Sequence, residues 1–160
     1  MLCNDPNNRI PLREYLEIQN KMYVDNFLEK RESLQNIIMI DDKYLKSVNI
    51  THDQIADALE NITMKCLHCN INNIIINKKY EIICEKCDPI TCPFQNKLFY
   101  PSNIIFDNIL TIRNIDSNEE IKFNSILIHM IRDHHFFGGK NTIYRLEPID
   151  IIRILDMYNK

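Results

Sequence analysis

Two Cys-x-x-Cys pairs stand near the middle of this chain of 160 residues. The first pair is Cys66 and Cys69, the second is Cys84 and Cys87, and fourteen residues separate the pairs. Zinc prefers four soft or borderline ligands in a tetrahedron, and four thiolates meet that requirement. We therefore expect these four cysteines to form one structural Zn²⁺ site that fixes the middle of the chain. The same ligands also hold iron, so the choice between zinc and iron stays open.

The sequence between the two pairs predicts a β-hairpin. Apolar residues cluster at Ile74 to Ile76 and at Tyr80 to Ile83, and residues 77–79 between them are typical of a turn. A hairpin of this length returns the second cysteine pair to the first. Residues from about 63 to 95 therefore resemble the zinc-ribbon family, and this resemblance implies a small module stabilised by metal.

Two neighbouring residues compete as ligands. His68 lies inside the first pair, where we expect it to be a solvent-facing spacer. Cys92 follows the second pair after a gap of four residues that contains Pro89. This gap suits a metal-binding turn less well than the two-residue gaps, so we favour the set of four cysteines.

Outside this module the sequence predicts helices. Apolar residues recur at helical spacing from Leu12 onward, which indicates a long amphipathic helix over about 12–36. The apolar run Ile37 to Ile40 fits either a strand or the buried end of that helix. Thr51, with Gln54 three residues later, predicts a capping box for a short helix.

A second candidate capping box lies in the C-terminal part, at Ser117 and Glu120. It predicts a helix through Ile131 that ends at the glycine pair 138–139. A last amphipathic helix is expected from about Ile149 to Tyr158.

These elements predict an α+β fold with helical N- and C-terminal parts around a central zinc-ribbon β-hairpin. The parts are a helical segment at 1–62, a zinc-ribbon module at 63–100 and a C-terminal helical segment at 101–160. A chain of 160 residues also fits a single domain, so both organisations stay open.

Charge and composition narrow the class of protein. The apolar share of 45% supports a folded core, and the net charge is −3. Residues 1–59 carry seven Lys/Arg and ten Asp/Glu, whereas residues 60–160 carry twelve of each. No stretch is basic enough for the phosphate contacts that dominate non-specific nucleic-acid binding. A protein partner is therefore favoured over a nucleic acid, and both stay open.

The sequence also indicates a compartment. No basic segment followed by an apolar run opens the chain, and no window approaches the roughly 18 apolar residues of a membrane span. We therefore expect a cytoplasmic protein without membrane contact, in which paired cysteines bind metal rather than form disulfides. The sequence is compatible with any oligomeric state.

A polar cluster lies near the end of the predicted C-terminal helix. Its members are His129, Arg132, Asp133, His134 and His135, with Arg145 further on. Helical spacing puts His129 and Asp133 on one face. We favour a structural account in which protonated His134 and His135 interact with the helix dipole. In the alternative account the six residues surround a ligand pocket or partner surface, where Arg145 clamps an anion.

The run Asp133, His134 and His135 beside a zinc module resembles the HNH nuclease family, with Asn141 at a matching distance. That family carries a further histidine after the asparagine, but no histidine follows His135. Its metal is usually held in a ββα core, whereas this run is predicted on a helix. The resemblance implies, as an alternative function, a metal-dependent hydrolase or nuclease that uses these three residues.

The main expectation is a small zinc-binding adaptor or regulatory protein without enzymatic activity, which recognises a protein or nucleic acid. Four thiolates leave no open coordination position for catalysis. No Ser-His-Asp or Cys-His arrangement follows from the spacing either.

Overall fold

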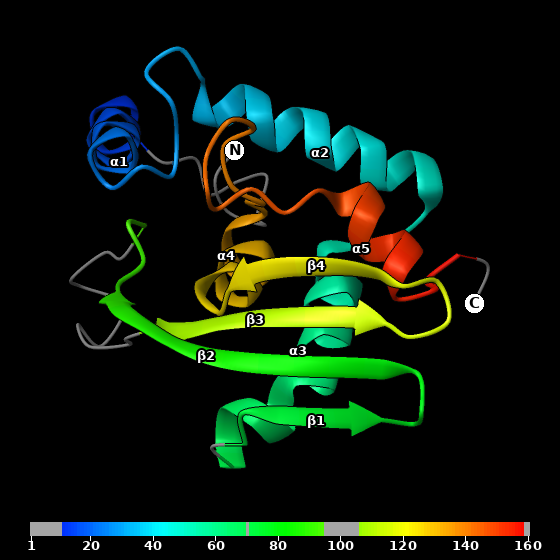
Figure 1. Cartoon of the computed structure of the whole chain (residues 1–160). Coiled ribbons are helices and arrows are strands. Elements are labelled where there is room, and N and C mark those ends of the chain that lie inside the picture. Colours follow the sequence, from blue (N-terminus) through cyan, green and yellow to red (C-terminus); the bar gives the residue numbers. More distant parts are fainter. Residues whose placement is uncertain (1–10, 70, 95–105, 159–160) are drawn as a thin grey trace.

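The computed structural model describes residues 11–69, 71–94 and 106–158. In this part of the chain, helices accompany a four-stranded antiparallel sheet with the strand order β1-β2-β3-β4 (Figure 1). The elements are α1 (Leu12–Val24), α2 (Leu34–Val48), α3 (His52–Cys69), β1 (Asn73–Ile76), β2 (Tyr80–Ile90), β3 (Phe106–Asn114), β4 (Glu119–Asn124), α4 (Ile126–His134) and α5 (Pro148–Ile154). The prediction of a mixed α+β fold is confirmed at this level.

The central hairpin forms where the sequence predicts it. Asn77 and Lys78 both adopt left-handed backbone conformations, with φ of 54° and 55°. Left-handed conformations at both central residues of a turn define type I′, in which asparagine is favoured, and residues 77–79 form the loop. The N–H of Lys79 donates to the carbonyl of Ile76 at 3.0 Å and closes the turn. β1 and β2 then pair in register from Ile76 and Tyr80 outward.

One face of the sheet carries the core. Alternate residues of β2, β3 and β4 point to this face because the side-chain period of a strand is two. The buried ones are Tyr80, Ile82, Leu110, Ile112, Ile121 and Phe123. α3 lies behind the sheet and packs on β2 and α4 (Figure 1). The sheet joins strands from both sides of residue 100, so the predicted zinc-ribbon module and C-terminal part share it.

The prediction of one helix over 12–36 is wrong. α1 ends at Val24, and Asn26 then takes a left-handed conformation with φ of 63°. This break turns Phe27 and Leu28 into the core, where both are buried. Ser33 caps α2, since its hydroxyl accepts the N–H of Asn36 at 3.4 Å. The apolar run at 37–40 is therefore part of α2.

The capping box at the start of α3 is confirmed. The N–H of Gln54 donates to the Thr51 hydroxyl at 3.1 Å, and the N–H of Thr51 donates to the Gln54 side chain at 2.9 Å. α3 then continues as far as Cys69. The first cysteine pair thus lies on the last turns of a helix, not on a loop like the knuckle of a zinc ribbon.

The second predicted capping box is wrong. Ser117 and Glu120 belong to the turn and strand that precede α4, because Ile121 and Phe123 alternate on the buried face of β4. α4 begins only at Ile126, whose N–H donates to the side-chain oxygen of Asn124 at 3.0 Å.

The ends of the last two helices also differ from the prediction. α4 ends at His134 and is followed by His135 in a left-handed conformation with φ of 57°, so the glycine pair does not end it. Gly138 instead permits a close approach, since a Cβ there would lie 2.5 Å from the carbonyl oxygen of Tyr144. α5 ends at Ile154, short of the expected Tyr158.

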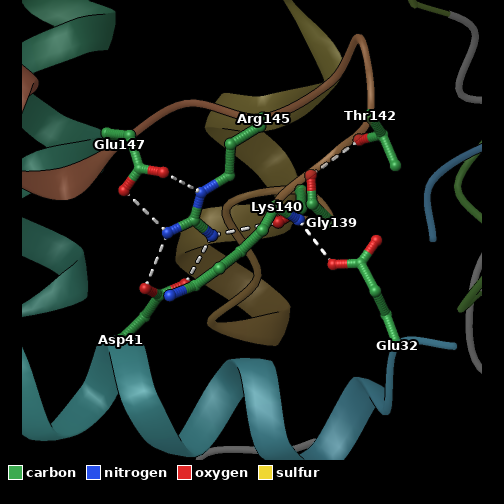
Figure 2. Close-up of polar contacts among 8 residues, drawn as sticks. Glu32, Asp41, Gly139, Lys140, Thr142, Arg145 and Glu147 are labelled. Atoms are coloured by element: carbon green, nitrogen blue, oxygen red, sulfur yellow. Dashed lines mark hydrogen bonds and ion pairs between the residues drawn. The ribbon is translucent and has the colours of Figure 1, made fainter. Parts of the chain in front are cut away.

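The segment after Gly138 is fastened to α2 and to the chain before it (Figure 2). The N–H of Lys140 donates to the Glu32 carboxylate at 2.7 Å. Arg145 donates to both oxygens of Asp41 on α2, at 2.8 and 2.9 Å, and to the carboxylate of Glu147. This ion pair is buried, with 7% of the Arg145 side chain and 5% of the Asp41 side chain exposed.

Candidate metal centre

Cys92, His129 and His134 meet in the interior beside α4. Each offers one ligand atom, and the three atoms lie within 4.8 Å of one another. Cys92 comes from the segment that follows β2, whereas both histidines lie on α4. Cysteine and histidine are the ligands that zinc prefers, so this group can bind a metal ion.

Asp133 orients the first imidazole. Its Oδ2 lies 2.7 Å from Nδ1 of His129, four residues earlier on the same helix. A carboxylate in this position holds the proton on Nδ1 and leaves the lone pair of Nε2 for a metal. Burial lowers the pKa of His129, and the neighbouring Asp133 opposes that effect.

His134 is the most deeply buried imidazole of the group, with 6% of the residue exposed. Burial lowers its pKa to about 3, with help from His129 and His135, so the ring is neutral near pH 7. Its Nδ1 is buried and has no hydrogen-bond partner among the described residues. A neutral imidazole with an unsatisfied buried nitrogen is costly unless that nitrogen binds something. The structural account of a protonated His134 is therefore wrong.

Aromatic rings hold the two imidazoles in place. Phe94 stacks on His134 with ring centroids 4.1 Å apart, and Phe106 stacks on His129 at 5.4 Å. The two histidine rings stand nearly perpendicular, at 82°, with centroids 5.1 Å apart. Ligand atoms in a tetrahedral zinc site are about 3.3 to 3.8 Å apart, as follows from metal–ligand distances of about 2.0 to 2.3 Å. Small side-chain rotations can therefore close this group around one ion.

The four cysteines of the predicted site lie on two elements. Cys66 is on α3 and Cys84 is on β2, and burial and then the Cys84 thiol raise the pKa of Cys66. Cys84 donates to Oδ1 of Asn108 at 3.4 Å, and the thiol of Cys87 accepts from Nδ2 of Asn124 at 3.6 Å. The side chain of Cys69 lies outside the described residues, so the four-cysteine site stays a prediction.

Asp133, His134 and His135 do not gather at one centre. Asp133 pairs with His129, and His134 faces Cys92. His135 stacks instead on His52 of α3, with centroids 3.7 Å apart and an angle of 2° between the rings. These two histidines form a second group of metal-ligand types together with Asp42 of α2.

The two predicted arginines are engaged in ion pairs. Arg132 reaches across to α3, where it contacts Asp57 at 2.8 Å and also pairs with Glu60. Burial alone would lower the pKa of Arg145, but its hydrogen bonds to Asp41 and Glu147 raise it overall. An anion clamp at Arg145 is therefore wrong, because the guanidinium is already held by two carboxylates.

A cleft of about 330 Å³ opens beside the metal group. His129 and Asp133 line it together with Arg132, Asn108 and Asp107. His129 and Asp133 thus lie on one face of α4 and contact each other, as helical spacing predicts.

The sequence indicated Cys92 only as a poorer competitor for the four-cysteine site, and it gave no indication of His52 or Asp42. One signal for the first group was present: His129 and His134 are separated by four residues, a spacing found for histidine pairs in zinc sites. The second group had no such signal, because its residues come from three different helices or helix ends.

Comparison with models of known protein families, with curated proteins and with solved structures found no match to this chain. The case for a function therefore depends on the geometry of the molecule. Among the described helices, none has both the length and the apolar character needed to cross a bilayer.

Proposed function

We propose that this chain is a zinc-binding protein that acts without enzymatic activity, as an adaptor or regulatory module that recognises a protein partner. The observation that carries the proposal is the meeting of Cys92, His129 and His134 in the apolar interior. One thiolate and two imidazoles suit zinc better than the hard cations, which prefer oxygen ligands. We place zinc here rather than iron because this mixed set is typical of zinc sites.

The zinc has a structural role in this proposal. Cys92 and His134 are 1% and 6% exposed, so substrate has little access to them. An ion held there links the segment after β2 to α4, and its binding free energy adds to the free energy of folding. The acidic charge balance supports a protein partner over a nucleic acid.

One observation favours a second candidate, a metal-dependent hydrolase. His129 is a member of the metal group and Asp133 orients its ring. Both residues also line the cleft of about 330 Å³. Catalytic zinc sites have three protein ligands and an open position, and this group also has three ligands. The candidate differs from the nuclease-like alternative because His135 takes no part.

The zinc proposal is tested by native mass spectrometry of the full chain before and after chelation, together with thermal unfolding. We expect bound zinc, and we expect His134→Phe to bind one zinc fewer because Phe removes the ligand and keeps an aromatic ring against Phe94. At free zinc about a thousandfold above Kd the metal contributes about 4 kcal/mol. This corresponds to a Tm higher by about 8 to 16 °C.

The control is Asp42→Asn, which changes the second group and should leave the zinc count unchanged. A wild-type chain that binds no zinc, or a His134→Phe chain that keeps all of it, would contradict the proposal. The preference for a protein partner is tested with random-sequence duplex DNA. Salt-dependent binding of that DNA would favour a nucleic-acid partner instead.

A further inference from the structure

The group of Cys92, His129 and His134 has one ligand fewer than the four of a structural zinc site. We propose that Cys87 supplies the fourth ligand, so that the centre is a Cys₂His₂ zinc site. This inference rests on the proposed zinc binding. It takes Cys87 away from the predicted four-cysteine set, whose other members are Cys66, Cys69 and Cys84.

The spacing of the four residues fits such a site. Four residues separate Cys87 from Cys92, and four separate His129 from His134. Cys₂His₂ sites typically have two to four residues between the cysteines and three to five between the histidines. Both gaps of this chain fall within those ranges.

The structure also connects Cys87 to the helix that carries the histidines. Nδ2 of Asn124 donates to the Cys87 thiol at 3.6 Å, while Oδ1 of Asn124 accepts the first N–H of α4, from Ile126, at 3.0 Å. A helix rises about 1.5 Å per residue, so His129 lies about 4.5 Å further along the axis than Ile126. Asn124 therefore holds Cys87 near the first residue of α4, and His129 lies about one turn further along that helix.

The regular pairing of β2 ends just before Cys87. β2 pairs regularly with β3 from Tyr80 to Lys86, and the register shifts between Lys86 and Ile90. Cys87 is thus the first residue of the irregular stretch, and irregularities of this kind re-aim side chains. The hydrogen bonds of the two thiols differ: Cys84 donates to Asn108, whereas Cys87 accepts from Asn124.

Coordination by Cys87 is balanced in protons and charge. When Cys87 and Cys92 bind Zn²⁺, each thiol releases its proton to water, and a coordination sphere of two thiolates and two neutral imidazoles is neutral. The Asn124 amide then stabilises the Cys87 thiolate as a hydrogen-bond donor outside the coordination sphere.

The test is NMR of the full wild-type chain loaded with NMR-active cadmium in place of zinc. We expect one cadmium resonance that correlates with the Hβ protons of Cys87 and Cys92 and with the imidazole protons of His129 and His134. If Cys87 correlates instead with a cadmium ion that also correlates with Cys84, the inference is overturned. If no cadmium ion correlates with either histidine, the proposed function itself fails, so the two failures are distinguishable.

A matched pair of variants gives a second readout. Cys87→Ser and Cys84→Ser each remove one half-buried thiol from the same strand. Zinc should shift the imidazole nitrogen resonances of His129 and His134 in Cys84→Ser as in wild type. In Cys87→Ser we expect at least about 100-fold weaker zinc binding at these histidines. Wild-type affinity at these histidines in Cys87→Ser would refute the assignment.

Discussion

The two histidine groups of this protein contain the same number of imidazoles but arrange them differently. The rings of His129 and His134 are nearly perpendicular, at 82°, whereas those of His52 and His135 are stacked face to face, at 2°. An imidazole nitrogen directs its lone pair in the plane of the ring. The lone pairs of two stacked rings lie in parallel planes and therefore cannot both point at one ion, whereas those of perpendicular rings can.

The carboxylates of the two groups differ as well. Asp133 lies against His129, where it fixes the tautomer that binds metal. Asp42 forms an ion pair at 2.9 Å with Lys46, one turn later on α2. Closeness of ligand-type residues is thus insufficient, because ring orientation and the neighbour of each ligand decide whether a metal fits. We expect zinc at the first group and a stacked, metal-free pair at the second.

Lowering the pH should have the largest effect on the two histidine groups. Burial lowers the pKa of His134 to about 3 and that of His52 to about 4, from about 6.5 when unfolded. Below pH 6.5 the unfolded chain binds protons that the folded chain does not, so stability is full above that pH and falls as the pH drops towards the folded pKa. At pH 4 the loss from His134 in the metal-free chain is about 3 kcal/mol, since one pKa unit is worth about 1.4 kcal/mol.

Urea unfolding of the metal-free chain between pH 7.5 and pH 4 measures this loss. Zinc should raise the free energy of unfolding at pH 7.5 but not at pH 4, because at pH 4 protons compete with zinc for the cysteine sulfur. His52→Phe should keep this zinc effect and His134→Phe should lose it. A zinc effect that disappears in His52→Phe would reverse our ranking of the two groups.

Loss of the Asp133 carboxylate, which orients His129, should have the next largest effect. Asp133→Asn keeps the size of the side chain but no longer holds the proton on Nδ1 as a carboxylate does. Loss of such outer partners typically weakens metal binding ten- to a hundredfold. We expect that decrease in a competition titration with a chromophoric chelator. Asp42→Asn, the equivalent change in the second group, should leave the zinc affinity at its wild-type value.

The sequence predicted those parts of the molecule that local chemistry decides. The hairpin at 73–90 follows from two left-handed turn residues between apolar runs, and the start of α3 follows from Thr51 and Gln54. The capping box at Ser117 failed because Ser and Glu three residues apart also occur before a strand. There the alternation of Ile121 and Phe123 on the core face prevailed.

The metal group could not be predicted in the same way. Cys92 and His129 are 37 positions apart, and β3, β4 and the first turn of α4 lie between them. Their contact depends on how the sheet and α4 pack, which no local spacing encodes. The structure separates the adjacent histidines 134 and 135 for a related reason. The left-handed backbone at His135 turns its ring away from His134 and towards α3.

The smallest effect should come from the stacked pair, and His135→Asn tests it. Asparagine tolerates the left-handed conformation at this position, where φ is 57°, so the helix end is preserved. Only the ring stacked on His52 is lost, and such ring pairs contribute about 0.5 to 1.5 kcal/mol. We expect Tm to fall by about 2 to 5 °C with the zinc content unchanged. His135→Ala should cost about 1 kcal/mol more, because alanine strains the left-handed backbone. Loss of zinc in His135→Asn would mean that the second group binds metal after all, and the contrast in ring geometry would then not decide where the ion binds.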